Sequence, residues 1–271
     1  MLKRQLGSTD IEVSIIGLGT VKFGRNQNVH YPHPFQLPSD DEIRTLLADA
    51  QTLGINLLDT APAYGHSEER LGKFLQGQRQ QWIIASKAGE DFINGQSYFD
   101  FTAANIRHSV ERSLKRLQTD YLDIVLIHSD GNDLSIIQKE NALNTLTELK
   151  KSGKIRAIGM STKTIAGGIL ALDHSDAVMV TFNPTASSER DVIRYAHQQQ
   201  KGILIKKALA SGHLNKIARE DAALQAFNFI LREPGISSIV IGTVNSEHLR
   251  ANAEYAKIAC LSSSIQQSSC K

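Results

Sequence analysis

The stretch Ile55–Gly72, INLLDTAPAYGHSEERLG, contains the repeating unit from which the fold of this chain can be worked out. Its apolar run ends abruptly in Asp59, and Tyr64 and Gly65 follow after a proline. A polar segment with helical periodicity begins directly after them. The stretch therefore predicts a buried strand, a turn that carries a carboxylate and a phenol, and a helix.

The same alternation of a short apolar run and a helical stretch recurs along the chain. The apolar runs are SIIGLGT, INLLDTA, QWIIASKAG, LDIVLIHS, IRAIGMS, AVMVTFN, GILIKKAL and SSIVIGT. Strands that are apolar on both faces and alternate with helices are typical of a parallel sheet covered by helices. Eight units predict an α/β fold of the (β/α)8 TIM-barrel type, and the alternating segment 2–14 predicts an N-terminal β-hairpin that closes its bottom.

An open, doubly wound sheet is the rival architecture. That fold usually carries a Gly-rich dinucleotide-binding fingerprint, whereas GLGTVKFG has the wrong spacing and follows a hairpin. No Pro- or Ser-rich linker interrupts the repeat. We therefore expect residues 1–271 to form a single barrel domain, with residues 261–271 as a flexible tail.

The composition limits the classes of function. Charged residues make up 21% of the 271 positions and the formal net charge is +2, which argues against a dedicated nucleic-acid or membrane-surface role. The two cysteines, Cys260 and Cys270, form neither a disulfide framework nor a metal-ligand cluster. No signal-peptide core and no run of membrane-spanning length is evident. These features predict a cytoplasmic protein without nucleic-acid or membrane partners.

Four polar side chains stand at or beside the ends of consecutive strands. Strand two ends in Asp59 with Tyr64 in the loop above it, strand three in Lys87, and strand four in His128. In a (β/α)8 barrel the carboxyl ends of the strands carry the active site. Taken singly, His128 could be a hydrogen-bonded core histidine, and Lys87 with Asp59 a structural ion pair. Together at one mouth, the four favour a catalytic set.

These residue types suit the protonation of a carbonyl oxygen. A phenol has an ordinary pKa near ~10, too high for efficient acid–base work at neutral pH. The ammonium of Lys87 is expected to lower the pKa of Tyr64, and Asp59 to keep that ammonium charged and in place. His128 can hydrogen-bond the same substrate oxygen. The set predicts proton delivery to a carbonyl oxygen as hydride reaches the carbonyl carbon.

The stretch LLDTAPAYG, the lysine of IIASKAG and the histidine of DIVLIHS resemble the aldo-keto reductases. The resemblance runs from the N-terminal hairpin to about Asn252 and includes SSIVIGTVNSEHLRAN. It implies a (β/α)8 barrel and a nicotinamide dinucleotide bound without a Rossmann motif. Tyr64 would be the proton donor, Lys87 and Asp59 its tuners, and His128 the group that orients the substrate carbonyl.

The resemblance also implies a cofactor pocket with unusual members. Ser161 and Thr162 stand where a Ser-Asn pair usually holds the nicotinamide carboxamide, and Met179 where a Gln often completes the clamp. One of Lys206 and Lys207 is expected to face the mouth. The implied cofactor-binding residues are Thr20, Val21, Asp59, Ser161, Thr162, Met179, Lys206, Lys207, Leu209, Ser211, Gly242, Thr243, Asn245, His248 and Asn252.

The choice between two nicotinamide cofactors stays open. Some family members that prefer the 2′-phosphate carry Lys and Arg where this chain has Gly242 and His248. Nearby lysines and the family as a whole favour NADPH. We expect NADPH, with NADH as the alternative.

The long segment after strand one, VKFGRNQNVHYPHPFQLPS, is expected to lie at the barrel mouth and to shape substrate binding. Lys22, Tyr31 and Phe35 are its candidate substrate-lining residues. The HYPH within it suggests a metal site, but no third ligand has suitable spacing, so no metal is predicted.

Three hypotheses follow. The first is an NAD(P)H-dependent oxidoreductase that reduces small aldehydes or ketones to alcohols, with Tyr64 as proton donor. The second is a nicotinamide-nucleotide-binding regulatory protein on the same scaffold with little turnover, motivated by Thr162 and Met179. The third is an unrelated metal-dependent barrel hydrolase, which metal analysis of the purified protein would test.

Overall fold

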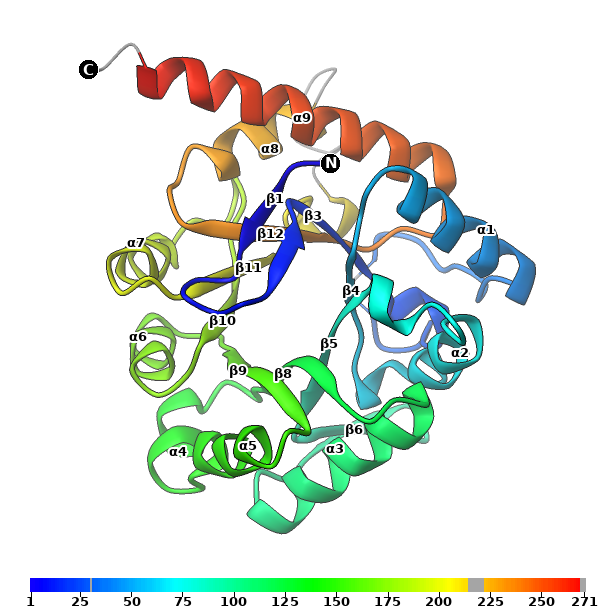
Figure 1. The fold of residues 1–271 in the computed structure, drawn as a ribbon, viewed down its shortest axis with the longest axis vertical. Coiled ribbons are helices and arrows are strands. Elements are labelled where there is room, and N and C mark those ends of the chain that lie inside the picture. Colours follow the sequence, from blue (N-terminus) through cyan, green and yellow to red (C-terminus); the bar gives the residue numbers. More distant parts are fainter. Residues whose placement is uncertain (30, 214–221, 269–271) are drawn as a thin grey trace.

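Eight parallel strands close into a barrel, and helices cover its outside (Figure 1). A computed structural model describes residues 1–29, 31–213 and 222–268, with side chains to residue 262 in the last helix. In order around the barrel the strands are β3 (Ile16–Gly19), β4 (Leu57–Asp59), β5 (Ile83–Ala88), β8 (Leu122–His128), β9 (Ile155–Ser161), β10 (Ala177–Thr181), β11 (Gly202–Lys206) and β12 (Ile236–Ile241). β12 pairs with β3 and closes the ring. The TIM-barrel prediction is confirmed.

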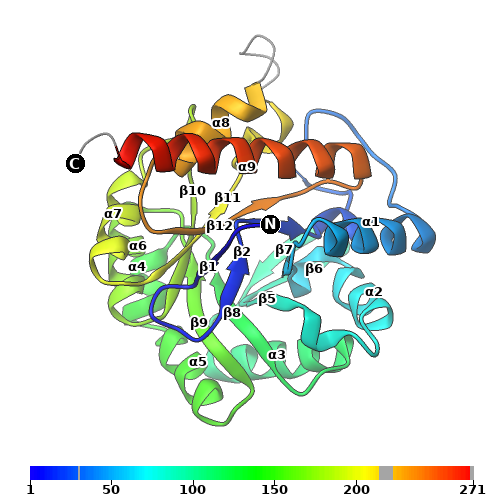
Figure 2. The same cartoon turned by 45° about the horizontal axis from the view of Figure 1, so that its top comes forward.

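The helices pack on the outer face of this ring. They are α1 (Asp40–Thr52), α2 (Ser67–Phe74), α3 (Ala103–Leu117), α4 (Asp133–Gln138), α5 (Ala142–Lys151), α6 (Ile165–Asp173), α7 (Arg190–Gln198), α8 (Ala222–Leu231) and α9 (Ser246–Ser268). Short 3-10 turns are η1 (Val21–Phe23), η2 (Pro62–Tyr64), η3 (Arg79–Gln81) and η4 (Ala210–Gly212). Figure 2 shows α9 lying along α8 and beside α1.

The C-terminal segment that was expected to be a flexible tail is helical over most of its length, since α9 continues to Ser268. Residues 269–271, including Cys270, lie outside the described residues. Among the residues that the structure describes, no helix combines the length and the apolar character that crossing a bilayer requires.

In the described part of the chain, the two larger apolar clusters lie between the strands and helices and inside the barrel. The inner cluster contains Leu57, Ala85, Leu126 and Leu204, all on barrel strands. Alternate residues of a strand point to the same face. The inner cluster therefore identifies, on each strand, which of the later residues point toward the barrel axis.

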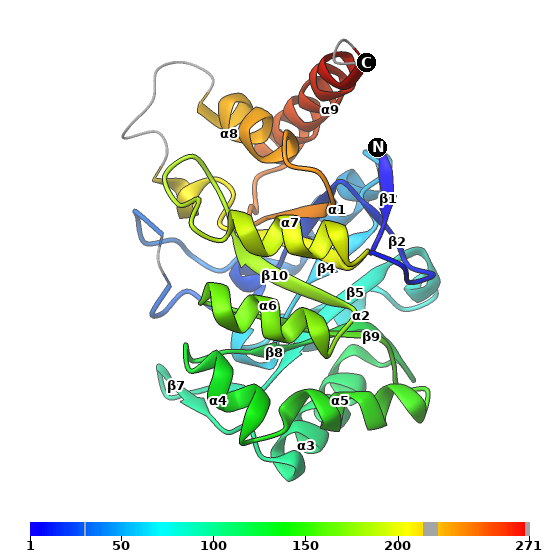
Figure 3. The same ribbon diagram turned by 90° about the vertical axis from the view of Figure 1, so that its left-hand side faces the viewer.

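Hairpins lie at both ends of the barrel (Figure 3). β1 (Lys3–Gln5) and β2 (Glu12–Ser14) pair antiparallel, and Leu6, Ile11 and Val13 from this hairpin join the inner cluster. The hairpin thus closes the bottom, as predicted. A second hairpin, β6 (Glu90–Ile93) with β7 (Gln96–Phe99), follows β5 at the opposite end.

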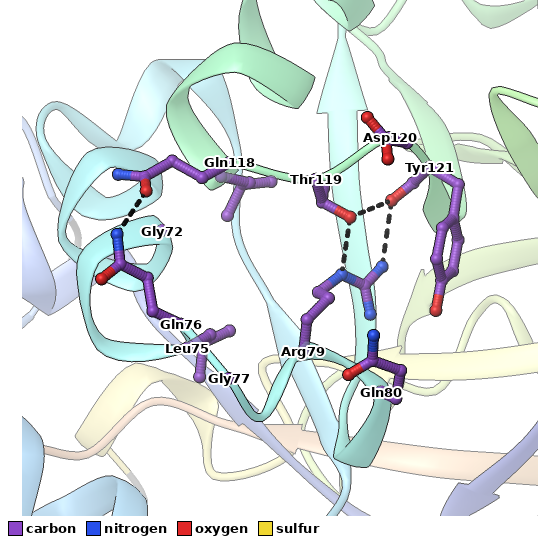
Figure 4. A pocket seen from close by; sticks show the side chains of 11 residues that line it. Gly72, Leu75, Gln76, Gly77, Arg79, Gln80, Gln118, Thr119, Asp120 and Tyr121 are labelled. Carbon is purple, nitrogen blue, oxygen red and sulfur yellow. Dashed lines mark hydrogen bonds between the residues drawn. The ribbon is translucent and has the colours of Figure 1, made fainter.

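A polar groove of about 320 Å³ lies at the bottom, between the C-terminal ends of α2 and α3 (Figure 4). Its central side chain, Arg79, donates to the hydroxyl of Thr119, the carbonyls of Trp82 and Tyr121, and the carboxylate of Asp123. The groove borders the segments that lead into β5 and β8, whereas Lys87 and His128 stand near the other ends of these strands. These internal contacts indicate a structural role for the groove, at the end of the barrel opposite to the four predicted catalytic residues.

Candidate active site

The strand ends bring the four predicted catalytic residues to one mouth. Asp59 follows Leu57 by two positions, Lys87 follows Ala85 by two, and each therefore points inward with its inner-cluster predecessor. On β8, Leu126 is inside and His128 comes two positions later. The polar side chains stand directly above the apolar filling of the barrel.

Asp59 and Lys87 form a buried ion pair across neighbouring strands. Lys87 Nζ donates to Asp59 Oδ1 at 2.5 Å and to the carbonyl of Thr60 at 2.9 Å. The side chains are only 6% and 2% exposed. Burial alone would lower the pKa of Lys87, but the charges and hydrogen bonds of Asp59 and Tyr64 together outweigh it and raise the pKa to about 12. Lys87 therefore remains an ammonium across the working pH range.

Two glycines place Tyr64 over this pair. Tyr64 ends η2, and Gly65 after it has φ +60°, a conformation that side chains other than glycine rarely adopt. A Cβ on Gly65 would meet the carbonyl oxygen of Gly24 at 2.2 Å. The turn after β4 thus packs backbone to backbone on the loop after β3. The Lys87 ammonium consequently lies 4.7 Å from the centroid of the Tyr64 ring.

The expectation that Tyr64 would have a lowered pKa is wrong. Burial raises the pKa of the Tyr64 phenol, and the opposing charge of Lys87 does not outweigh burial and the carboxylate of Asp59, so the pKa is about 12. The phenol is therefore protonated at neutral pH. Lys87 acts on this group by limiting the rise rather than by producing a ready phenolate.

His128 has a carboxylate partner that sequence reasoning missed. Its Nδ1 lies 2.6 Å from Oε2 of Glu90, the first residue of the β6–β7 hairpin. The ring of His128 stands edge-on to that of Tyr64, with centroids 6.3 Å apart. A signal was present in the sequence, because Asn94-Gly95 between EDFI and QSYF is a strong two-residue hairpin pattern. That pattern would have folded Glu90 back over the mouth.

The other side of the mouth carries the residues implied for the nicotinamide end. Ser161 ends β9, and Lys206, which follows the inner residue Leu204 by two positions, ends β11. Lys206 Nζ donates to Ser161 Oγ and to the carbonyl of Thr162, both at 2.8 Å. Of the two adjacent lysines, Lys206 faces inward, whereas Lys207 is exposed and follows the strand with φ +55°.

Thr162 and Met179 differ in polarity: one has a hydroxyl without a partner in the described residues, and the other has an apolar side chain. Thr162 is fully buried, and its Oγ1 has no hydrogen-bond partner among the described residues. Met179, paired with Ser161 across the β9–β10 ladder, belongs to the inner apolar cluster. This side of the mouth therefore contains one buried hydroxyl without a partner in the described residues, beside an apolar side chain.

The remaining predicted cofactor residues lie around the ends of β3, β11 and β12. Thr20 is fully buried and its hydroxyl donates to the carbonyl of Asp59 at 2.9 Å. Asn245 Oδ1 accepts from the amide of His248 at 3.0 Å and so caps the start of α9. The exposed residues of this set are Lys207, Gly242, Asn245 and His248; the buried or partly buried ones are Val21, Leu209, Ser211, Thr243 and Asn252.

The loop after β3 brings its three candidate substrate residues together. Lys22 Nζ lies 4.1 Å from the ring centroid of Tyr31 and 4.9 Å from that of Phe35. The two rings meet edge-on at 5.5 Å. A Cβ on Gly242 would stand 2.8 Å from the Tyr31 hydroxyl. This loop therefore reaches across the mouth from the proton-delivering side to the start of the β12–α9 connection.

The HYPH sequence of this loop, which suggested a metal site, is described only in part. His30 of the HYPH sequence lies outside the described residues. In the described part of the chain no group of three or more His, Cys, Asp or Glu side chains is placed to hold a metal ion.

Comparison with known proteins decides the family. The profile of the Aldo/keto reductase family matches residues 15–228, most of the barrel. This chain belongs to that family. As an aldo-keto reductase family member it is classed with the oxidoreductases that use a nicotinamide cofactor and act on small carbonyl substrates.

Individual relatives agree with this membership. L-galactose dehydrogenase of Arabidopsis thaliana is 33% identical over 79% of this chain and 67% of its own length. Among solved structures, the putative aldo-keto reductase PA4992 of Pseudomonas aeruginosa is 50% identical and superposes with a TM-score of 0.87, covering 95% of this chain and 94% of that one. The holo form of AKR11C1 from Bacillus halodurans is 25% identical, with a TM-score of 0.80 over 94% and 90% of the two chains.

Proposed function

We propose that this aldo-keto reductase reduces aldehydes or ketones to alcohols with NADPH, and that Tyr64 is the proton donor. One observation carries the proposal: a buried Lys87–Asp59 ion pair lies directly beneath a protonated phenol at the barrel mouth. A structural ion pair has no need of a phenol above it. Burial keeps the Tyr64 phenol protonated, so it has a proton to donate. The nearby Lys87 ammonium would stabilise the phenolate that remains afterwards.

Each residue of the set has a distinct part in that step. Tyr64 holds its proton until a carbonyl oxygen gains negative charge as the carbonyl carbon is reduced. Lys87 stabilises the charge that then develops on the phenol oxygen, and the ion pair with Asp59 holds the Lys87 ammonium in place. The surrounding burial makes these charge interactions stronger than they would be in water.

The residues on the β9–β12 side fit a nicotinamide dinucleotide, which when bound would supply the hydride. The Ser161 hydroxyl accepts from Lys206 but still has a hydrogen to donate, and the buried hydroxyl of Thr162 lacks a partner in the described residues, so both could hydrogen-bond a carboxamide placed there. The start of α9, with exposed backbone beside Gly242, suits a phosphate because helix N-termini attract anions. The holo form of the related AKR11C1 supports a cofactor on this scaffold.

Substitution of Tyr64 by phenylalanine tests the proposed donor. Tyr64→Phe removes only the hydroxyl, so carbonyl reduction should fall by about 10²- to 10⁴-fold while the Kd for NADPH changes little. Tyr195→Phe, which removes an exposed hydroxyl that donates to Asp173 on the outer helices, is the matched control and should retain activity. Turnover of Tyr64→Phe close to that of the unaltered protein would exclude Tyr64 as donor.

One observation favours the second hypothesis, a nucleotide-binding protein with little turnover. Lys206 occupies the hydroxyl of Ser161, which the nicotinamide carboxamide would otherwise use. Titration with NADPH and NADH, followed by a panel of carbonyl compounds with the tighter cofactor, separates the two functions. Tight binding without turnover of any carbonyl would favour the regulatory protein, and steady turnover the reductase.

A further inference from the structure

The β6–β7 hairpin carries a buried carboxylate to the histidine of the catalytic set. Glu90 is 8% exposed, and its Oε2 lies 2.6 Å from His128 Nδ1. Its other oxygen, Oε1, accepts from the hydroxyl of Ser97 across the hairpin at 2.6 Å. The guanidinium of Arg25, from the loop after β3, lies 3.6 Å from Oε1. Three different segments therefore hold this carboxylate in place.

We propose that Glu90 is a positioning residue that fixes His128 with Nδ1–H toward its carboxylate and leaves Nε2 for the substrate oxygen. The link to substrate rests on the proposed reductase function. The tautomer rests on the 2.6 Å contact between His128 Nδ1 and the Glu90 carboxylate and on the ionisation of that carboxylate, not on turnover. With the hydrogen of the neutral ring on Nδ1, His128 can donate a hydrogen bond from Nε2 to a carbonyl oxygen only as the imidazolium.

The tautomer follows from what a carboxylate can do. Burial would raise the pKa of Glu90, but the close contact with His128 Nδ1, the hydrogen bond from Ser97 and the charges of His128 and Arg25 outweigh it and lower the pKa to about 2. The ionised group is an acceptor only, so the Nδ1 that faces it must carry a hydrogen. In the neutral imidazole, Nε2 then has a lone pair and no hydrogen.

Several groups act on the charge of His128. Burial lowers the pKa of His128, and the ammonium groups of Lys87 on β5 and Lys206 on β11 lower it further, whereas Glu90 on β6 raises it. The ring of Tyr64 from η2 packs edge-on against it and is uncharged at neutral pH. The net pKa is lowered, so a neutral imidazole predominates near pH 7. Glu90 is the one group of these that stabilises the imidazolium.

Reduction and oxidation should therefore use different forms of the pair. When His128 is protonated, Nε2–H can donate to a carbonyl oxygen alongside Tyr64, which favours reduction at lower pH. When it is neutral, the lone pair of Nε2 can accept from the hydroxyl of an alcohol, which favours oxidation at higher pH. Glu90 sets the pH at which one form replaces the other.

Glu90→Gln tests the proposal, because it removes the charge with little change in shape. Proton NMR of the imidazole signals, with His128 assigned by comparison with His128→Asn, reads the titration directly and needs neither cofactor nor turnover. We expect the pKa of His128 to fall by about one unit or more, as for loss of an opposite charge in contact. The pH at which reduction falls by half as the pH rises through the His128 titration should move down by the same amount.

Asp91→Asn is the matched control on the same hairpin. Asp91 pairs with Arg112 of α3 rather than with His128, so its loss should leave the titration of His128 unchanged. Should Glu90→Gln not fold, Glu90→Asp keeps the charge but draws it back by one methylene, and a smaller fall in the same pKa is expected. An unchanged His128 titration in a folded Glu90 variant would overturn the proposal.

The two proposals can fail separately. If the pKa of His128 falls in Glu90→Gln while the unaltered protein reduces no carbonyl in the panel, the positioning role stands and the reductase proposal fails. If the unaltered protein reduces carbonyls but the pKa of His128 and the pH profile are the same in Glu90→Gln, the reductase stands and the role of Glu90 is excluded.

Discussion

The two halves of the barrel mouth are built differently. On the β4–β5–β8 half, Asp59, Lys87 and His128 each contact a charged partner supplied by the chain itself. On the β9–β12 half, Thr162 has a buried hydroxyl without a partner in the described structure, and Ser161 is bonded to a lysine. The first half is therefore held by charge pairs within the chain, whereas the second has a buried hydroxyl with neither a charged nor a hydrogen-bonding partner among the described residues.

The largest effect is expected where the β4–β5–β8 half is broken. Lys87→Met removes one partner of a buried pair and leaves the carboxylate of Asp59 uncompensated, which should lower the free energy of unfolding by about 3–5 kcal/mol. Reduction should fall by about 10²-fold or more, because the phenolate of Tyr64 loses its stabilising cation. Thermal or denaturant unfolding and steady-state turnover measure the two effects.

The double variant Asp59→Asn/Lys87→Met separates stability from chemistry. With both charges removed, much of the lost stability should return, while activity should not. A double variant as unstable as Lys87→Met alone would mean that the loss comes from packing, and recovery of activity in it would exclude Lys87 from the reaction.

A smaller effect is expected from moving Tyr64 without changing it. Gly65→Ala adds a Cβ that would meet the carbonyl of Gly24 at 2.2 Å, so the turn that holds the phenol must shift. A displacement of this kind should reduce kcat by about tenfold or more, since small misplacements at a reacting centre are costly. Gly77→Ala is the control, because Gly77 has a similar φ of +74° and nothing within 4 Å of the added Cβ.

The two variants should differ in activity even if both lose stability. Both place alanine at positive φ and should be destabilised by about 1–2 kcal/mol for that reason. Only Gly65→Ala disturbs the contact between the two mouth loops. Equal kcat values for the two variants would show that the glycine contact does not position Tyr64.

The difference between the halves also explains how far the sequence could predict the structure. The barrel follows from strands that are apolar on both faces, and Asp59, Lys87 and His128 stand out because each interrupts or ends such a run. Glu90 does not stand out, since it begins a short hairpin strand outside the barrel pattern and its partner His128 is 38 positions away. Its contact with His128 depends on the β6–β7 hairpin, which is not one of the eight repeating strand–helix units of the barrel.

Burial and barrel closure account for the rest of what was missed. The raised pKa of Tyr64 reflects desolvation, which the identity of its neighbours in the sequence does not reveal. The bond from Lys206 to Ser161 joins β11 to β9 across the intervening strand β10. Such a contact arises only from the curvature of the closed barrel.

The smallest expected effect concerns the β9–β12 half, and it involves Lys206. Burial lowers the pKa of Lys206 to about 8, partly opposed by the charge of Glu189 and reinforced by Lys207, Lys163 and Lys87. The group is therefore an ammonium below about pH 8 and loses its charge above it. If Ser161 holds the nicotinamide carboxamide as proposed, this charge lies beside a ring that is cationic when oxidised and neutral when reduced.

The sign of the effect follows from that difference in charge. Below about pH 8 the Lys206 ammonium should weaken binding of NADP⁺ relative to NADPH by about three- to tenfold, as two like charges several ångströms apart in a partly buried site would. The ratio of the Kd for NADP⁺ to the Kd for NADPH should therefore fall as the pH rises through about 8. In Lys206→Met the ratio should be low and independent of pH, whereas the exposed neighbour variant Lys207→Met should keep the dependence. Fluorescence titrations of the unaltered protein and the two variants at pH 6.5 and 9 measure all six ratios. A pH-dependent ratio that persists in Lys206→Met would place the responsible charge elsewhere on this half of the mouth.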